Sequence, residues 1–302
     1  MKNKIVYIAL SADILHHGHI NLINRAKQYG KVTAGLLTDS AISTQKRLPL
    51  LNFNQRKKIL ENISGISKVV AQNEWEYAKN ILKLKPDYMI HGDDWIFGSD
   101  KNLRSGTIKA LKKVGGKLVE IPHTKNISSH SLKERMHLES TVPSNRQAIL
   151  KRLLEAKKMC RFLEAHSPLS AIIAEQVFYK NKNGKKIEFD GFWSSSLTDS
   201  TLKGKPDIEV LDINQRLTNI NDIFDVTSKP LIIDIDTGGK IEHLEINLKT
   251  IERSGASAII MEDKKGLKKN SLFGNTVKQE QENIKEFSKK ISAGKKATTK
   301  KL

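Results

Sequence analysis

Apolar and polar positions in the first half of the chain follow two regular spacings. Short runs of consecutive apolar residues predict buried strands, and apolar residues three or four positions apart predict helices. The expected strands are Lys4–Leu10, Lys31–Leu37, Val69–Ala71, Asp87–His91 and Lys117–Ile121. The expected helices are Gly18–Gln28, Arg56–Ile63, Trp75–Leu84 and Ser105–Val114. Strands that alternate with helices predict a parallel sheet with helices on both faces, which is an α/β fold.

The second half of the chain alternates in the same way. A turn at Val142–Asn145 starts an expected helix over Arg146–Ala165, and an apolar run follows at Leu169–Phe178. Further strands are expected at Phe189–Trp193, Leu231–Asp236 and Ala258–Glu262, with helices over His243–Ser254 and Lys278–Ile291. This pattern gives about four strand–helix units before the sequence ends. We therefore expect two α/β domains, over residues 1–141 and 142–302.

Length, charge and cysteine content narrow the class of protein. The 302 residues suit two domains of about 150 residues each, and no apolar stretch approaches the ~20 residues of a membrane span. A single cysteine, Cys160, leaves no internal disulfide and indicates a reducing, cytoplasmic setting. The formal net charge is +19, but ten of the 52 basic residues are Arg and the rest are dispersed Lys. Dispersed Lys is typical of a solvated surface, so nucleic-acid binding is the less favoured interpretation.

A histidine motif lies between the first expected strand and the first expected helix. His16, Gly18 and His19 form an HxGH pattern at the start of the helix. A helix start offers unpaired N–H groups and the positive end of the helix dipole, and glycine lets a phosphate approach the main chain. Two histidines one turn apart can share the charge of a triphosphate in a transition state. The alternative interpretation is a pair of surface or capping histidines.

Three polar loops follow other expected strands, where ligands bind in open parallel sheets. They are Lys46–Arg47, Gly92–Trp95 and Ile127–Ser129. Taken singly, each is equally well explained as an ordinary polar loop. We expect Trp95 to face a nucleotide pocket and Trp75 to belong to the core.

Together these residues resemble the cytidylyltransferase family of small nucleotidyltransferases, over about residues 1–137. The resemblance implies a Rossmann-like domain in which a phosphate or phosphonate oxygen attacks the α-phosphorus of CTP and pyrophosphate leaves. It also implies that His16 and His19 are catalytic. The implied nucleotide-binding residues are Asp13, Gly18, Lys46, Arg56, Asp94, Trp95, Ile127, Ser128 and Ser129.

A second group of polar residues follows the strands of the second half. Asp234 and Asp236 end one expected strand, and Glu262 ends the next. Carboxylates at the carboxyl ends of parallel strands suit a hydrated Mg²⁺ ion. Asp207 lies in a loop, and a glycine-flanked segment that contains Lys268 has the composition of a lid. Solvated loop ends are the alternative interpretation of each part alone.

The order of these residues resembles the phosphoenolpyruvate mutase branch of the isocitrate lyase superfamily. The resemblance implies a (β/α)8-type barrel that moves a phosphoryl group from the enol oxygen of phosphoenolpyruvate to C3, giving phosphonopyruvate. Asp207, Lys268 and Asn270 are then expected to be catalytic, and Asp234, Asp236 and Glu262 to hold Mg²⁺. The implied substrate-binding residues are Trp193, Ser195, Leu197 and Ser271.

The two resemblances together are similar to cytidylyltransferase–mutase fusions of phosphonate biosynthesis. The chain supplies about four of the eight barrel strands, so we expect a shortened product of a longer reading frame with an incomplete mutase pocket. Self-association is then expected to cover the open face. Two alternatives stay open. One is that the cytidylyltransferase half alone is active, and the other is a non-catalytic, Lys-rich binding protein.

Overall fold

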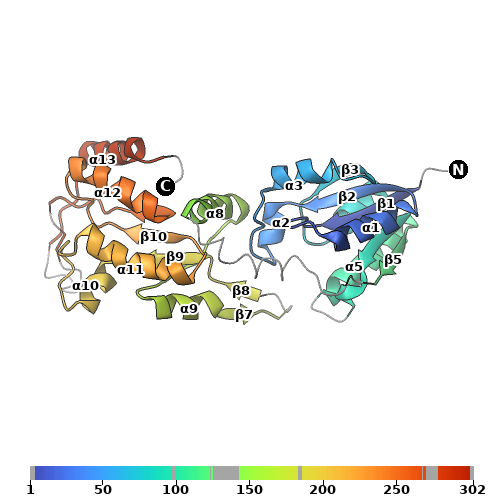
Figure 1. Cartoon of the computed structure of the whole chain (residues 1–302), viewed down its shortest axis with the longest axis horizontal. Coiled ribbons are helices and arrows are strands. Elements are labelled where there is room, and N and C mark those ends of the chain that lie inside the picture. The colour runs from blue at the N-terminus through green and yellow to red at the C-terminus, as the bar shows by residue number, and fades with distance from the viewer. Residues whose placement is uncertain are drawn as a thin grey trace. The chain divides into compact units, whose positions relative to one another are not determined.

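The computed structural model describes residues 4–96, 100–122, 124, 143–182, 186–266, 268–269 and 278–299. It divides into two compact units (Figure 1). The first consists of Met1–Met136 with two short segments, Glu155–Lys157 and Tyr179–Ile187. The second consists of His137–Leu154, Lys158–Phe178 and Glu188–Leu302. The expected boundary after residue 141 stays a prediction, because residues 125–142 lie outside the described ranges.

The first unit contains a five-stranded parallel sheet in the order β3-β2-β1-β4-β5. Its strands are β1 (Ile5–Leu10), β2 (Lys31–Leu37), β3 (Ile66–Gln72), β4 (Tyr88–Gly92) and β5 (Lys117–Ile121). Its helices are α1 (His17–Lys27), α2 (Asp39–Ser43), α3 (Phe53–Leu60), α4 (Ala78–Leu84) and α5 (Lys101–Val114), with a 3-10 turn, η1, at Asp93–Trp95. Every strand and helix predicted for this half is confirmed within a few residues, and the short α2 is an addition.

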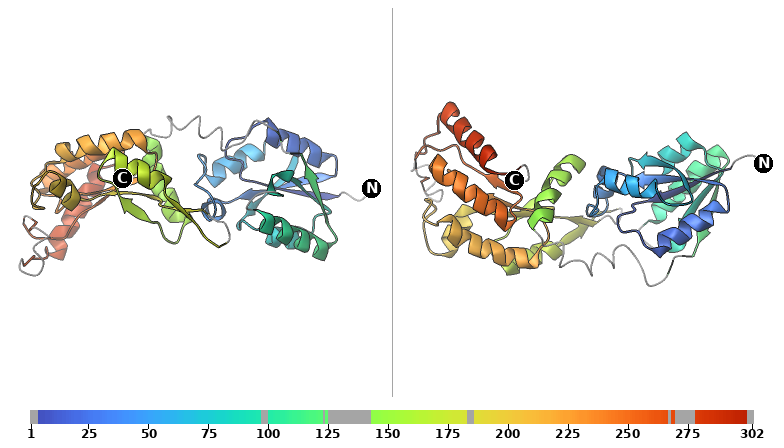
Figure 2. Two further views of the ribbon diagram at one scale, coloured as in Figure 1. Left: turned by 90° about the horizontal axis from the view of Figure 1, so that it is seen from below. Right: turned by 45° about the horizontal axis from the view of Figure 1, so that its top comes forward.

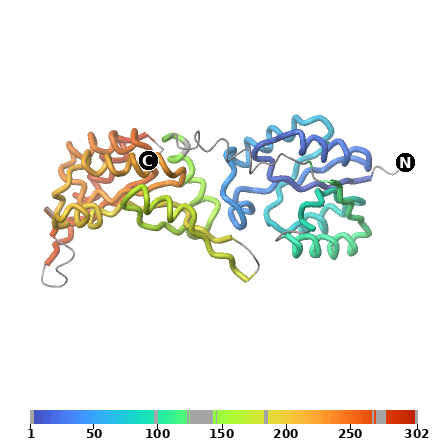
Figure 3. Tube along the Cα trace, turned by 60° about the horizontal axis from the view of Figure 1, so that its bottom comes forward, coloured from blue at the N-terminus to red at the C-terminus, as the bar shows by residue number. Residues whose placement is uncertain are grey.

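Helices cover both faces of this sheet because consecutive residues of its central strand β1 are apolar. Val6, Ile8 and Leu10 of β1 pack against α1 and α3 on one face. Tyr7 and Ala9 point to the opposite face, where α4 and α5 cover them. Side chains of a strand alternate between the two faces of a sheet, so a strand that is apolar throughout must be covered on both. The connected strands and helices can be followed in Figure 3.

The second unit contains a four-stranded parallel sheet in the order β11-β10-β9-β6. Its strands are β6 (Phe162–Glu164), β9 (Gly191–Ser194), β10 (Leu231–Asp234) and β11 (Ala258–Ile260). Its helices are α8 (Pro143–Ala156), α9 (Pro168–Gln176), α10 (Ser196–Leu202), α11 (Ile213–Val226), α12 (Ile241–Ser254) and α13 (Ile284–Ala297). A separate two-stranded sheet pairs β7 (Phe178–Lys180) with β8 (Lys186–Glu188).

Two expectations for the second half are wrong in detail. The helix predicted over Lys278–Ile291 begins only at Ile284, where Asn283 caps α13. The helix predicted over Arg146–Ala165 ends at Ala156, and β6 lies inside its expected range. The apolar run at Leu169–Phe178 forms the helix α9, so the first strand of the sheet is β6. A strand of three residues is too short to show a period of two, and pairing with β9 is what fixes it.

The core of the second unit lies between the sheet and its helices. Phe192 of β9 and Leu231 and Ile233 of β10 are fully buried among apolar side chains of α9, α11 and α12. Helix α13 lies beside α12, as Figure 2 also shows. This packing leaves the carboxyl ends of the four parallel strands at one edge of the unit, where ligands bind in sheets of this kind.

Capping residues set the ends of these helices. Ser167 caps α9 and accepts a hydrogen bond from the Ser170 N–H, with a proline at the first helical position. Asp212 caps α11 in the same way. Gly255 ends α12 with a φ of +102°, a conformation that glycine adopts without steric cost.

Candidate active sites

Four polar segments meet at the carboxyl edge of the second sheet. Ser196 begins α10 after β9, Asp234 ends β10, Asp236 lies two residues beyond it, and Glu262 follows β11. Asp207 joins them from the loop between α10 and α11. The sequence predicted the grouping of Asp234, Asp236 and Glu262, because parallel neighbouring strands bring their carboxyl ends to the same edge, whereas Ser196 was not expected in the site.

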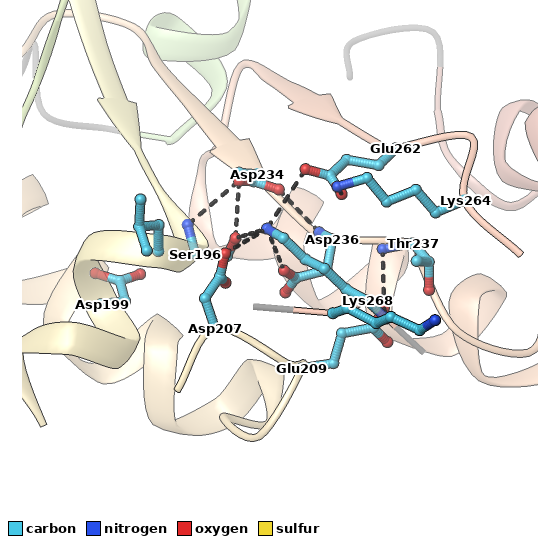
Figure 4. A network of polar contacts seen from close by, with 12 residues as sticks. Ser196, Asp199, Asp207, Glu209, Asp234, Asp236, Thr237, Glu262, Lys264 and Lys268 are labelled. Atoms are coloured by element: carbon cyan, nitrogen blue, oxygen red, sulfur yellow. Dashed lines mark hydrogen bonds and ion pairs between the residues drawn. The ribbon is translucent and has the colours of Figure 1, made fainter. Parts of the chain in front are cut away.

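Lys268 lies at the centre of this group, and its ammonium contacts most of it (Figure 4). Nζ is 2.9 Å from Asp207 Oδ2, 3.1 Å from Asp236 Oδ1 and 3.4 Å from Glu262 Oε1. It also donates a hydrogen bond to Ser196 Oγ at 3.0 Å. The Lys268 and Asp207 side chains are 3% and 1% exposed, so this is a buried ionic cluster rather than a surface ion pair.

Burial and charge act in opposite directions on the groups of this cluster. Burial lowers the pKa of the Lys268 ammonium, but the Asp207 and Asp236 carboxylates outweigh it, and the net shift of the pKa is upward. Burial raises the pKa of Asp236, while hydrogen bonds and the Lys268 charge offset part of that rise. The cluster therefore holds a positive charge next to carboxylates at a largely buried position.

The carboxylate of Asp234 is engaged with the main chain around it. Its Oδ2 accepts hydrogen bonds from the Ser196 hydroxyl at 2.9 Å and the Ser196 N–H at 3.3 Å. Its Oδ1 accepts from the Asp236 N–H at 2.9 Å. Asp236 has a φ of +54°, which is unusual for a residue other than glycine and typical of functional loops. Asp234 thus holds the start of α10 and the turn that presents Asp236.

A second buried ion pair lies beside the same edge of the sheet. Arg216 of α11 is 3% exposed, and its Nε lies 2.8 Å from Asp199 Oδ2 of α10. The guanidinium also donates to the carbonyl oxygens of Ser194 and Asp234, which end β9 and β10. Sequence reasoning missed Arg216. The signal was an arginine on the apolar face of α11, four residues before the buried Ile220.

The remaining residues expected in this site lie near it or outside the described ranges. Trp193 lies in β9 with 37% of its surface exposed, and Ser195 precedes α10, in which Leu197 lies. Asn270 and Ser271 lie outside the described residues. Their substrate-binding and catalytic roles stay predictions.

The donor atoms of this cluster fit a magnesium ion in kind. Asp234, Asp236 and Glu262 offer the carboxylate oxygens that Mg²⁺ prefers. Their present arrangement is set by the Lys268 ammonium, and in the described part of the chain no three acidic, histidine or cysteine side chains are grouped as a metal site. The chemistry of the residues therefore suits the ion, although the Lys268 ammonium contacts Asp236 and Glu262, and the Asp234 oxygens accept hydrogen bonds from Ser196 and the Asp236 N–H.

In the first unit, His16 and His19 lie at the N-terminus of α1, as predicted. His16 Nδ1 accepts a hydrogen bond from the Gly18 N–H at 3.2 Å, and His19 Nδ1 accepts from the His16 N–H at 3.3 Å. The two ring centroids are 4.1 Å apart. A ring nitrogen that accepts a hydrogen bond carries no proton, so the proton of a neutral ring in this arrangement lies on Nε2.

We predict that Gly18→Ala impairs this motif without unfolding the unit. A Cβ at residue 18 would lie 2.9 Å from Cε1 and Nδ1 of His16, so the imidazole must move and its cap is weakened. We expect CTP-dependent pyrophosphate release to fall about 100-fold, the scale of a small misplacement of a catalytic group. The free energy of unfolding should fall by about 1 kcal/mol. The matched control is Gly106→Ala in α5, where a Cβ meets no atom within 4 Å. Equal kinetics for both variants would contradict the prediction.

Asp13 and Lys46 lie where the sequence placed them, in loops after β1 and α2. Asp13 is buried, and its Oδ1 accepts hydrogen bonds from the Leu50 N–H at 2.7 Å and the Leu51 N–H at 3.4 Å. The exposed Lys46 holds its ammonium 5.2 Å from the ring centre of Trp75, which packs against the core as expected. Their contacts with a nucleotide stay predictions.

Arg56 differs from the expectation of a nucleotide-binding residue. Its side chain is fully buried in α3. The guanidinium donates to the carbonyl oxygens of Ser11, Leu37 and Leu51 and pairs with Asp39 at 2.6 Å. Arg56 therefore joins the chain segments that follow β1 and β2 and precede α3, and its role in this structure is to position them.

Trp95 also differs from expectation, because it belongs to the core. It is 2% exposed, its ring stacks on His91 with centroids 3.6 Å apart, and its Nε1–H donates to Glu120 at 2.6 Å. Arg104 holds the same carboxylate through two hydrogen bonds of 2.8 Å. The neighbouring Asp94 is exposed. Ile127, Ser128 and Ser129 lie outside the described residues.

We predict that His91 makes the first unit less stable in mild acid. Burial against Trp95 lowers the pKa of His91 below its ordinary value of about 6.5. Below about pH 6.5 the unfolded chain binds a proton that the folded chain does not. The free energy of unfolding should therefore fall, by at most about 1.4 kcal/mol per pH unit, until the lowered pKa is reached. Denaturant unfolding between about pH 5 and 7.5 should show a shallower slope for His91→Phe. An unchanged slope would contradict the prediction.

None of the helices in the described ranges combines the length and the apolar character needed to cross a bilayer.

Two protein families match the chain in separate segments. The phosphoenolpyruvate phosphomutase profile matches residues 150–302. The cytidylyltransferase-like profile matches residues 11–135. The second unit and the first unit thus each correspond to one of the two resemblances drawn from the sequence.

Individual relatives divide in the same way. Phosphonopyruvate hydrolase of Variovorax sp. (strain Pal2) is 35% identical over 145 residues, which are 48% of this chain and 46% of that protein. Glycerol-3-phosphate cytidylyltransferase of Bacillus subtilis (strain 168) is 32% identical over 138 residues, which are 45% of this chain and 98% of that protein. The crystal structure of phosphoenolpyruvate phosphomutase from Streptomyces platensis subsp. rosaceus has a TM-score of 0.44 and 32% identity, covering 51% of this chain and 50% of that one.

The chain spans about half the length of the curated relatives that its second part matches. Because the phosphomutase profile covers just over half of the residues, the chain belongs to the phosphoenolpyruvate phosphomutase family, with a cytidylyltransferase-like domain before that part.

Proposed function

We propose that this chain is a phosphonate-biosynthesis enzyme with two activities. The second unit interconverts phosphoenolpyruvate and phosphonopyruvate, and the first unit transfers a nucleotidyl group from CTP to a phosphate or phosphonate. The observation that supports the activity of the second unit is the buried Lys268 ammonium, which lies among Asp207, Asp236 and Glu262 at the carboxyl edge of the sheet. An apolar protein interior holds such a cluster only at a high cost, which favours a functional role.

The mutase reaction rearranges bonds within one molecule. The bond between phosphorus and the enol oxygen breaks, a bond between phosphorus and C3 forms, and the enol becomes a ketone. No proton or co-reactant is consumed. Lys268 supplies positive charge to the phosphoryl oxygens, and Asp207 lies beside the migrating group. Magnesium, held by Asp234, Asp236 and Glu262, would supply further charge neutralisation.

Nucleotidyl transfer in the first unit relies on positioning and charge. An acceptor oxygen attacks the α-phosphorus of CTP, the bond to the β-phosphate oxygen breaks, and pyrophosphate leaves. The Nε2–H groups of His16 and His19 would donate to phosphate oxygens whose charge grows in the transition state. The positive end of the α1 dipole adds to this field.

Hydrolysis of phosphonopyruvate is a second candidate for the second unit. The 35% identity to a phosphonopyruvate hydrolase favours it. In that reaction water takes the phosphoryl group, so the products are phosphate and pyruvate rather than phosphoenolpyruvate. The mutase differs from it only in keeping water away from the phosphoryl group.

Phosphorus NMR of the purified chain with phosphonopyruvate and Mg²⁺ tests these proposals. We expect the phosphoenolpyruvate signal to appear, because that direction is downhill. Inorganic phosphate instead would favour hydrolysis, and no conversion would overturn both for this chain. Asp207→Asn and removal of Mg²⁺ by a chelator should each abolish conversion, whereas Asp222→Asn, on the exposed side of α11, should not.

The nucleotidyltransferase is tested separately by CTP-dependent pyrophosphate release with glycerol 3-phosphate or a simple phosphonate as acceptor. His16→Ala should abolish the release. The cytoplasmic setting and self-association stay predictions, and the presence of one cysteine in the sequence supports the first.

A further inference from the structure

Glu209 connects three segments at the edge of the phosphomutase cluster. It lies in the loop between α10 and α11, two residues after Asp207. Its Oε1 accepts hydrogen bonds from the Thr237 N–H and from the Lys268 N–H, both at 3.3 Å (Figure 4). One carboxylate oxygen therefore ties the loop of Asp207 to the turn after β10 and to the segment that carries Lys268.

These two amides belong to the residues that build the cluster. Thr237 follows Asp236, whose Oδ1 accepts a hydrogen bond from the Lys268 ammonium. Lys268 itself is held at both ends by the same loop, since Asp207 contacts its ammonium and Glu209 its main-chain N–H. A lysine ammonium on a flexible four-carbon stem reaches a defined point only if its main chain is fixed. Glu209 is the side chain that fixes it.

The backbone conformation at residue 209 supports this interpretation. Glu209 has a φ of +62°, in the left-handed region where a side chain is strained and glycine is not. A loop that only needed this turn would be better served by glycine. The glutamate retains the strain, and its side chain gains the two amide contacts, so the carboxylate itself is the useful feature.

We propose that Glu209 is a positioning residue of the phosphomutase site. It fixes the main chain at Thr237 and Lys268 so that the Lys268 ammonium reaches Asp207 and Asp236. This inference rests on the proposed function of that site.

Hydrogen–deuterium exchange on the full chain tests it without relying on activity. Glu209→Gly removes the acceptor and relieves the strained φ. Glu209→Gln keeps a carbonyl oxygen in place of the carboxylate. We expect the Thr237 and Lys268 amides to exchange about tenfold faster in Glu209→Gly, the scale of one lost hydrogen bond. Glu209→Gln should restore most of the protection, and the control Asp222→Asn should match the wild type. Unchanged exchange in Glu209→Gly would overturn the proposal.

Kinetics of the phosphonopyruvate reaction add a second reading. We expect kcat in Glu209→Gly to fall at least tenfold with a smaller change in KM, because a misplaced ammonium acts on the transition state. Denaturant unfolding should show no loss of stability, since the strain at residue 209 is removed. A Glu209→Gly variant with normal kcat would overturn the proposal. A wild-type chain that converts no phosphonopyruvate would overturn the proposed function, while the exchange experiment would still decide the role of Glu209.

Discussion

Replacing Lys268 with methionine should lower both the stability of the second unit and its activity, more than any other single change in that unit. Methionine keeps most of the apolar stem and removes the ammonium, so Asp207, Asp236 and Glu262 face one another without their shared positive partner. Removing one partner from a buried ion pair lowers the free energy of unfolding by about 3–5 kcal/mol. The kcat for phosphonopyruvate conversion should fall by about 100- to 1,000-fold, the range for loss of one transition-state donor.

Denaturant unfolding with and without Mg²⁺ measures this effect and its cause. If the loss comes from repulsion among carboxylates, Mg²⁺ should raise the free energy of unfolding more in Lys268→Met than in the wild type. The matched control is Lys269→Met, which removes a neighbouring ammonium from an exposed position. A Lys268→Met chain as stable as this control would show that the cluster contributes nothing to folding.

The first half of the fold could be predicted closely because its pattern has one simple cause. Residues such as Val6 and Tyr7 are adjacent, both buried and on opposite faces of the sheet. Their strand therefore had to be covered on both sides, and in a parallel sheet the alternating crossover helices provide that cover. In the second half, β6 has three residues and depends on pairing with β9, so the local sequence carries too little information to show it.

The candidate sites were predictable in position and less so in the direction of side chains. Parallel strands bring Asp236 and Glu262 to one edge, and this follows from topology alone. Whether an arginine or tryptophan in a matching motif faces a ligand or the core depends on its neighbours. Trp95 packs in an apolar cluster with Tyr77 and Leu103, and Glu120, on the adjacent strand, accepts the hydrogen bond of its buried N–H. Glu209 was missed because its importance lies in a left-handed backbone conformation that a sequence does not display.

The second large effect is expected for substitutions of Arg56. Their effects on stability and on CTP binding distinguish a structural role of this side chain from a ligand-binding role. If Arg56 bound the nucleotide, Arg56→Met would raise the KM for CTP and leave the free energy of unfolding nearly unchanged. The structure predicts the opposite, because the buried guanidinium holds the carbonyl oxygens of Ser11 and Leu37 together with Asp39. The loss of the donor for these buried groups should lower the free energy of unfolding of the first unit by about 3–5 kcal/mol.

We therefore expect Arg56→Met to unfold the first unit at a much lower denaturant concentration, with loss of pyrophosphate release following loss of the fold. Arg56→Lys should also be destabilised, since an ammonium cannot match the planar fork of donors. Arg25→Met, at an exposed arginine of α1, is the matched control and should unfold like the wild type. We would measure the unfolding curves and, for the fraction that stays folded, the KM for CTP. Together they distinguish the structural role of Arg56 from a nucleotide-binding role. A stable Arg56→Met chain with weakened CTP binding would return Arg56 to the nucleotide site.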